Sequence, residues 1–200
     1  MPETLTGLAP VIAPGARPLI LGSMPGAASL RRGEYYAHPR NAFWPIMERL
    51  FAHDAGPGDV SPGATRLDYE ARVAVLLEAR VAVWDVLRAA ERPGSLDADI
   101  SSPVANDIAA FFARHPAVRT VFFNGTKARA LWARHVAPAL PAGLEAREVV
   151  SALLAGLDLR LVTLPSTSPA NAALTFADKL AAWHVVREAA SRTPTAQRQP

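Results

Sequence analysis

The sequence contains no cysteine among its 200 residues. That absence excludes disulfide bonds, a thiol nucleophile and any cysteine-ligated cluster. Its five histidines are scattered without the spacing of metal ligands, so we expect neither a metal site nor a cofactor. The chain has no apolar run long enough to cross a membrane, and its first residues lack the pattern of a signal peptide. We therefore expect a cytoplasmic protein with no membrane partner.

Lysine is nearly absent as well, since Lys127 and Lys179 are the only two and arginine supplies the other basic residues. The formal net charge is +3 and the sequence pI is about 9.8. This modest excess of positive charge suits nucleic-acid binding but does not demonstrate it. The nucleotide composition of the coding sequence explains the arginine bias at least as well.

The overall composition is that of a globular protein, with 50% hydrophobic and 20% charged residues. A chain of this length predicts one domain with a substantial core. We assign residues 1–16 to an irregular lead-in, residues 17–190 to a single domain, and residues 191–200 to a disordered tail. We expect the protein to be a monomer.

Short apolar segments alternate with amphipathic ones along the chain, which predicts an α/β fold with a mainly parallel sheet. Residues 27–40 are expected to form a long loop, residues 53–63 a Gly/Pro-rich loop, residues 85–94 a short helix or turn, and residues 95–103 a polar loop. The expected strands are residues 19–22, 80–84, 118–123 and 159–164, and the expected helices are residues 41–51, 66–77, 104–115, 126–136 and 174–190.

Polar residues follow each of the four expected strands. In parallel α/β sheets, ligands bind beyond the carboxyl ends of the strands. The segments at those positions are Gly22-Ser-Met-Pro-Gly26, Trp84-Asp85, Asn124-Gly-Thr-Lys127 and Ser166-Thr-Ser-Pro-Ala-Asn171. We therefore expect the functional site at this edge of the sheet.

The first of these segments is followed closely by Tyr35-Tyr-Ala-His-Pro-Arg-Asn41 and by Phe43-Trp44. Loops rarely concentrate so many aromatic and polar side chains unless they line a site. Gly22 and Gly26 allow a ligand to approach the main chain, and Pro25 stiffens the turn between them.

Together with Ser166-Thr-Ser-Pro-Ala-Asn171, these motifs resemble the uracil-DNA glycosylase superfamily, most closely its hypoxanthine-DNA (deoxyinosine) glycosylase branch. The mismatch-specific uracil glycosylases share the His-Pro-x-Asn-x-Phe-Trp part but carry asparagine where this chain has Met24. The resemblance covers about residues 17–187. It implies a three-layer α/β/α fold with a four-stranded sheet, and a DNA glycosylase that flips a deaminated base, hypoxanthine first and uracil second.

Asn41 is the catalytic residue that the resemblance implies. Cleavage of an N-glycosidic bond builds positive charge on the deoxyribose and negative charge on the departing base, and an amide can hold the attacking water without titrating. The alternative is that Asn41 caps the helix that follows it.

Asp85 and His38 complete the catalytic candidates. Asp85 could orient water or accept a hydrogen bond from a purine N–H, or it could cap a helix over residues 86–90. His38 could contact a phosphate or the leaving base, or it could brace the loop. Their sequence positions leave these alternatives open.

Base binding is assigned to the first Gly-rich segment and to aromatic residues near it. Backbone N–H groups of Ser23 and Met24 could bind a base carbonyl, and a flipped base is held by stacking. The resemblance favours Phe43 for stacking, with Tyr36 second, whereas core packing is the alternative for Phe43 and the preferred role for Trp44. Asn124 could contact the base edge or form an Asn-Gly turn. The full set is Gly22, Ser23, Met24, Pro25, Gly26, Tyr36, Phe43 and Asn124.

DNA binding is assigned to the late serine-rich segment, which resembles the superfamily's second motif. Its hydroxyl and N–H groups suit phosphate binding, and an inserted side chain helps to hold open the gap left by a flipped base. As a plain sequence the segment is a loop with a helix cap. The residues assigned are Ser166, Thr167, Ser168, Pro169, Ala170, Asn171 and Leu174.

Neither lysine lies in the two motifs, so we expect a monofunctional enzyme that leaves an abasic site, because strand cutting needs an amine. One alternative is a non-catalytic DNA damage-binding module of the same fold. The other is a hydrolase of small nucleosides or esters, although no Gly-x-Ser-x-Gly motif surrounds Ser23.

Overall fold

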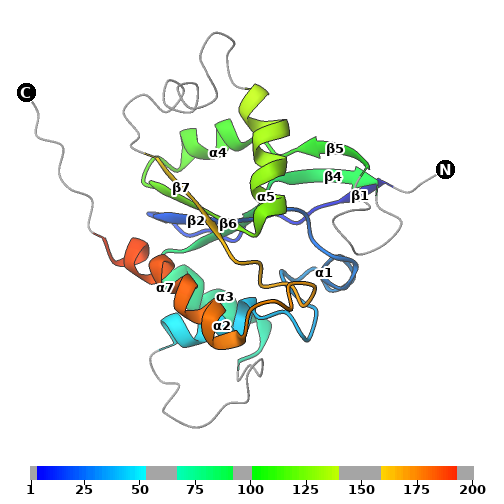
Figure 1. Ribbon diagram of the computed structural model, residues 1–200. Coiled ribbons are helices and arrows are strands. Elements are labelled where there is room, and N and C mark those ends of the chain that lie inside the picture. Colours follow the sequence, from blue (N-terminus) through cyan, green and yellow to red (C-terminus); the bar gives the residue numbers. More distant parts are fainter. Residues whose placement is uncertain (1–3, 53–66, 92–100, 140–158, 193–200) are drawn as a thin grey trace, which may run out of the picture.

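The computed structural model describes residues 4–52, 67–91, 101–139 and 159–192. Its centre is a parallel four-stranded sheet in the order β3-β2-β6-β7 (Figure 1). The strands are β2 (Pro18–Gly22), β3 (Ala82–Asp85), β6 (Thr120–Asn124) and β7 (Arg160–Leu164). All five residues of β2 are buried, as expected for an inner strand covered on both faces.

Helices cover both faces of this sheet, which confirms the three-layer α/β/α fold (Figure 1). Helices α2 (Phe43–Phe51), α3 (Tyr69–Glu78) and α7 (Phe176–Ser191) cover one face. Helices α4 (Ile108–Arg114) and α5 (Thr126–Leu131) lie on the other. Helix α5 runs on into a π-helical turn, η2 (Trp132–Val136), and then a 3-10 turn, η3 (Ala137–Ala139). Each expected strand and helix is present, with its ends shifted by a few residues.

A second, antiparallel sheet corrects three of the sequence-based expectations. It has the order β1-β4-β5, with β1 (Thr4–Thr6), β4 (Leu87–Glu91) and β5 (Ser101–Ala105). The described part of the expected helix or turn over residues 85–94 therefore contains strand β4, the end of the expected polar loop begins strand β5, and the irregular lead-in contains β1. These strands are short, and their pairing joins distant residues, which local patterns do not encode.

The expected loop over residues 27–40 also contains a helix, α1 (Ala27–Arg32), which ends at Gly33 in a left-handed conformation with φ 68°. Glycine adopts this conformation without penalty, so it terminates the helix. The expected loop over residues 53–63 lies outside the described residues. The tail expected over residues 191–200 is corrected at its start, because Ser191 is the last residue of α7, and residues 193–200 lie outside the described residues. The domain limits stay a prediction. Within the described parts of the chain, no helix is long and apolar enough to cross a membrane.

Candidate active site

Strands β2 and β3 end side by side and bring Gly22 against Asp85. The two residues are paired in register, and Asp85 is only 3% exposed. A Cβ atom at position 22 would collide with the Asp85 carboxylate and would lie 3.1 Å from the Tyr36 hydroxyl. Glycine is thus required at position 22, because it lets the side chains of Asp85 and Tyr36 lie close to the main chain. Asp85 is followed by β4 rather than by a helix, so the helix-cap alternative for Asp85 is wrong.

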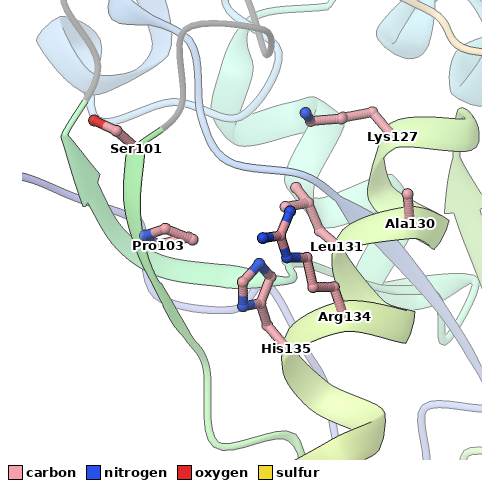
Figure 2. A pocket seen from close by; sticks show the side chains of 7 residues that line it. All are labelled: Ser101, Pro103, Lys127, Ala130, Leu131, Arg134 and His135. Atoms are coloured by element: carbon pink, nitrogen blue, oxygen red, sulfur yellow. The ribbon is translucent and has the colours of Figure 1, made fainter.

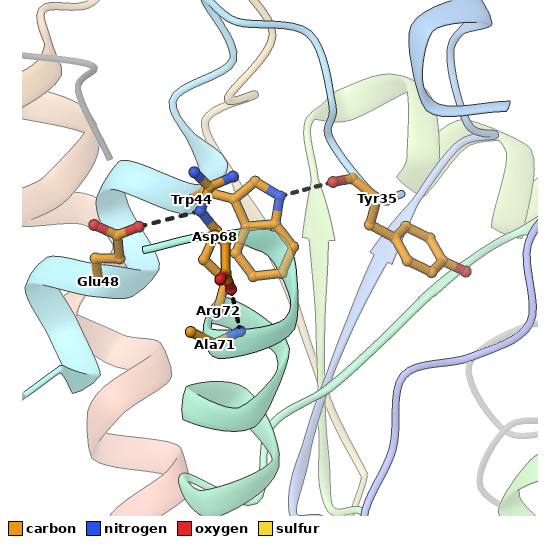
Figure 3. Close-up of polar contacts among 6 residues, drawn as sticks. All are labelled: Tyr35, Trp44, Glu48, Asp68, Ala71 and Arg72. Atoms are coloured by element: carbon orange, nitrogen blue, oxygen red, sulfur yellow. Dashed lines mark hydrogen bonds and ion pairs between the residues drawn. The ribbon is translucent and has the colours of Figure 1, made fainter. Parts of the chain in front are cut away.

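We call residues 22–42 the first loop. Its Tyr35 and Tyr36 pack with Phe43 and Trp44 at the start of α2, and we call these four residues the aromatic wall. The rings of Tyr36 and Phe43 are stacked with centroids 3.9 Å apart, and Phe43 is fully buried. Tyr36 has a left-handed backbone with φ 52°, which is uncommon for a bulky residue. The Trp44 indole N–H donates to the Tyr35 carbonyl oxygen at 2.7 Å (Figure 3), and Trp44 is 3% exposed. Trp44 therefore has the core role expected for it.

Tyr35 fixes the first loop to the residues that precede β2. Its hydroxyl group donates to the carbonyl oxygens of Leu8 and Ala9, at 3.2 and 3.1 Å. Burial raises the pKa of the Tyr35 phenol, and the negative charge of Asp85 raises it further. The neutral phenol is therefore the form that this site holds.

Asn41 and His38 lie in a turn at the end of the first loop. The Asn41 side-chain oxygen accepts from the N–H of Phe43 at 3.0 Å, and the backbone N–H of Asn41 donates to the His38 carbonyl oxygen at 2.8 Å. Ring atom Nδ1 of His38 accepts from the N–H of Arg40 at 3.1 Å. Both residues thus brace the turn. Asn41 precedes the N-cap residue of α2, Ala42, and its Nδ2 donor has no hydrogen-bond partner within the described residues.

We call residues 165–175 the second loop, and Thr167 joins it to the first. The N–H of Thr167 donates to Asn124 Oδ1, and Asn124 Nδ2 donates to Thr167 Oγ1, both at 2.9 Å. The carbonyl oxygen of Thr167 accepts from the N–H of Ala42 at 3.0 Å. Thr167 is 1% exposed. The end of β6 and both loops therefore meet at one buried residue.

The base of the second loop is held by helix α7. Lys179 Nζ donates to the Asn171 carbonyl oxygen at 2.8 Å, and the Trp183 indole N–H donates to the Pro165 carbonyl oxygen at 3.0 Å. Burial lowers the pKa of the Lys179 ammonium group. Asn171 Nδ2 in turn donates to the Ser166 carbonyl oxygen at 3.1 Å. Lys179 lies outside the serine-rich motif in the sequence, but the fold brings it into contact with Asn171 of that motif.

The loop's far end differs, because its side chains point to solvent. Ala172, Ala173 and Leu174 are exposed, and Leu174, at 39%, is one of two large hydrophobic side chains exposed among the described residues. Helix α7 begins directly afterwards, with a capping box between Thr175 and Asp178. An exposed apolar tip thus stands on a firmly held base.

The structure brings most of the predicted site residues to the expected edge of the sheet. The Gly22 segment, Asp85, Asn124 and the second loop follow the carboxyl ends of β2, β3, β6 and β7. Several of the predicted contact residues are buried, among them Met24, Phe43 and Thr167, at 5, 0 and 1% exposure. These three side chains pack inside the protein in this conformation. The roles of the individual site residues stay predictions.

Three residues that support the site were missed in the sequence. The Ser29 hydroxyl oxygen accepts from the N–H of Ala37 at 3.1 Å, and Lys179 and Trp183 bind the second loop. Only Lys179 carried a signal, because a lysine within an apolar helix stripe is rarely buried without a partner. Within the described residues, no group of three or more His, Asp or Glu side chains could hold a metal ion.

The sheet with its site at the carboxyl edge, bordered by two joined loops, defines an α/β enzyme of the kind that takes a ligand between those loops. Residues 9–187 match the Uracil DNA glycosylase superfamily. The chain belongs to this superfamily and is a DNA glycosylase, which confirms the resemblance seen in its motifs.

Two relatives and one solved structure give closer comparisons. A hypoxanthine DNA glycosylase of Methanosarcina barkeri is 32% identical over 121 residues, which cover 60% of this chain and 71% of the relative. Another, from Methanosarcina acetivorans, is 36% identical over 110 residues, which cover 55% of this chain and 64% of the relative. The match thus spans about two thirds of their length. A solution NMR structure from Methanosarcina acetivorans, described as a candidate uracil DNA glycosylase, superimposes with a TM-score of 0.68 at 26% identity, covering 95% of this chain and 100% of that one.

Proposed function

We propose that the protein is a monofunctional DNA glycosylase that removes hypoxanthine from DNA, with uracil as its second base, and leaves an abasic site. The observation that carries this proposal is the hydrogen bond from the N–H of Ala42 to the Thr167 carbonyl oxygen, which holds Ala42 and its neighbour Asn41 beside the second loop. A residue that places water and a loop that grips DNA are then next to one another. The names of the two Methanosarcina relatives support hypoxanthine as the first base.

In the proposed reaction, the oxygen of a water molecule bonds to C1′ while the bond from C1′ to the base nitrogen breaks. The bonding electrons leave with the base, which takes up a proton, and the water loses one to solvent. We assign the placement of the water to the Asn41 amide, whose Nδ2 is the group not used in the turn. We assign to the Asp85 carboxylate, which lies against Gly22, the stabilisation of the sugar cation by its negative charge.

The flipped base is assigned to the aromatic wall. Phe43 is fully buried beneath Tyr36, so we propose that the base stacks on Tyr36 and that Phe43 supports this ring from behind. Backbone N–H groups of Ser23 and Met24 are proposed to contact the base edge. His38 is exposed and braces the turn, and we assign to it a contact with a phosphate or with the leaving base.

The second loop is proposed to grip the phosphates and to fill the gap. Exposed Leu174 would enter the duplex as the base leaves the stack. A strand-cutting step would need a free amine at C1′, whereas Lys179 is 6% exposed and bound to Asn171. This arrangement supports the release of an abasic site without strand cleavage.

A base-release assay tests the proposal, with matched duplexes that carry deoxyinosine or deoxyuridine and an alkali step to cut abasic sites. We expect cleavage only after alkali, and faster release from the deoxyinosine duplex. Faster release of uracil would reverse the order of the two bases. Binding without release would identify a damage-binding module, and the absence of both would favour a small-molecule hydrolase. Cytoplasmic location and monomeric state remain predictions.

A further inference from the structure

A groove lies between helix α5 with its π-helical extension η2 on one side and strand β5 on the other (Figure 2). Its volume is about 350 Å³. The helical wall contributes Lys127, Ala130, Leu131, Arg134 and His135, and the strand contributes Ser101 and Pro103. None of these residues belongs to the two loops of the candidate active site.

The groove is basic. Lys127 lies on α5, Arg134 and His135 lie on its π-helical extension η2, and in Figure 2 the three side chains lie on the groove side of the helix. Among the described residues that line the groove there is no carboxylate, and neither Lys127 nor Arg134 forms an ion pair with a described residue. Glu91, which accepts from Ser102, is the acidic residue of the adjoining β4–β5 pair. Two cations on a concave surface favour an anionic ligand.

One end of the groove, at Lys127, lies close to the DNA-binding edge assigned above. Lys127 lies in the first turn of α5, two residues after Gly125, where a Cβ would lie 2.9 Å from that of Ser166 in the second loop. Lys127 and Arg134 are seven positions apart on α5 and its extension, which is roughly 10 Å along the helix axis. The two cations are thus far enough apart to contact different phosphates.

We infer that this groove binds the phosphodiester backbone of the DNA that flanks the target base. The inference rests on the proposed function and extends it, because it gives the enzyme a contact beyond the two motif loops. Lys127 and Arg134 each neutralise one phosphate, and the His135 ring adds a hydrogen-bond donor. The groove contributes to affinity and does not touch the reacting atoms.

The test measures how the dissociation constant for a duplex with a stable abasic-site analogue depends on salt. Each lost phosphate contact lowers the slope of log K against log salt by about one. We expect the double variant Lys127→Gln/Arg134→Gln to lose about two from this slope and to bind roughly tenfold more weakly at moderate salt. Base release at saturating protein is expected to stay within about twofold of wild type, since the reacting groups are untouched.

The matched control is Arg119→Gln/Arg160→Gln. It removes the same charge from two exposed side chains at the opposite edge of the sheet, where β6 and β7 begin. An equal slope for the two double variants would overturn the inference. Lys127→Arg/Arg134→Lys keeps both charges and should keep the wild-type slope, so a slope lost there as well would also overturn it.

The outcomes separate this inference from the proposed function. Base release from wild-type protein with an unchanged slope in the groove variant would refute the groove alone. A reduced slope in a protein that releases no base would refute the glycosylase proposal and retain the groove as a DNA contact.

Discussion

The two loops of the active site are built in opposite ways. The first loop is fixed by its own side chains, because Met24 and Tyr35 are buried in the core and Tyr36 stacks on Phe43. The second loop is fixed at its base by side chains from elsewhere, namely Asn124 on β6 and Lys179 and Trp183 on α7. Its tip at Leu174 remains exposed.

This difference matches the tasks proposed for the loops. A wall that receives a base should not rearrange, so packing against the core suits it. A segment that enters a duplex needs an exposed end, because it can fill the gap only after the base has left. The hydrogen bonds of Thr167 hold the two loops in a fixed position relative to one another. Mutations in the first loop should therefore impair the chemical step, and those in the second should impair engagement of DNA.

The largest effect is expected at Asn41, the residue of the first loop to which we assign the placement of the attacking water. Asn41→Ala should lower single-turnover base release by about 100-fold to 1,000-fold, the usual cost of losing one preorganised donor. DNA affinity should stay close to wild type. Rapid-quench base release and fluorescence anisotropy measure the two quantities.

Asn41→Ser separates this role from bracing of the turn, because a serine hydroxyl can still accept from the N–H of Phe43. We expect it to be nearly as inactive as the alanine variant. Full activity in Asn41→Ser would mean that Asn41 only shapes the start of α2, and wild-type activity in Asn41→Ala would refute the assignment altogether.

Gly22→Ala should produce the next largest effect, since its new Cβ collides with the Asp85 carboxylate. Overpacking of this kind costs about 1–3 kcal/mol of unfolding free energy. Gly26→Ala is the matched control, because a Cβ there meets nothing within 4 Å and the N-cap backbone is extended. Urea unfolding and base release should both show a large loss for Gly22→Ala and a loss below about 1 kcal/mol for Gly26→Ala. Equal losses would show that the first loop is not closely packed.

Asn124→Ala tests the joint between the loops. It leaves the buried N–H of Thr167 without its acceptor, which should cost about 1–3 kcal/mol. Thr167→Val removes only the hydroxyl contact and should cost less. If Asn124 acts only through Thr167, base release should fall no further in the double variant than in Asn124→Ala alone. A further loss of hypoxanthine preference in Asn124→Ala would instead indicate contact with the base edge.

The sequence alone was sufficient for the central sheet and for the location of the site. Strands β2 and β6 are continuous apolar runs that end in Gly-Ser and Asn-Gly, so both the strand and its end carry local signals. Parallel topology then places the ends together. The motifs supplied the family.

The second sheet and the contacts that hold the second loop could not be predicted from local sequence patterns. Strand β4 alternates buried Leu87 with exposed Arg88, but the stretch is too short to distinguish from a helical turn without its partner strands. The contact of Lys179 with Asn171 depends on how α7 packs. Burial of Thr167 likewise arises only when three segments meet. Tertiary contacts, rather than local preferences, determine these features.

Leu174→Ala is expected to have a smaller effect, confined to engagement of DNA. The side chain is 39% exposed, so unfolding free energy should change by less than about 0.5 kcal/mol. Base release from a paired duplex should fall about tenfold, since flipping costs a few kcal/mol and the insertion offsets part of it. Release from a single strand should not change.

Val104→Ala is the control for Leu174→Ala, because Val104 is the other large hydrophobic residue that is exposed in the described part of the chain, at 42%, and it lies on β5 outside both loops. An equal fall in duplex base release for both variants would argue against insertion. So would a fall in Leu174→Ala that is the same for single strands and duplexes, since a single strand has no gap to fill.

Tyr35→Phe should have the smallest effect at neutral pH. Its unfolding free energy should fall by about 1 kcal/mol, because the hydrogen bonds to the residues before β2 are lost. The larger consequence is alkaline. The pKa of Tyr35 is raised above its ordinary 10.0, chiefly by burial, so above that pH the unfolded chain loses a proton that the folded protein retains. Stability then falls with rising pH, by up to about 1.4 kcal/mol per pH unit for one such group. The variant lacks this contribution, so its urea unfolding free energy should fall less steeply above pH 10. Equal slopes in both proteins would show that the first loop does not keep this phenol buried, and the contrast between a packed first loop and an exposed second tip would lose its firmest physical basis.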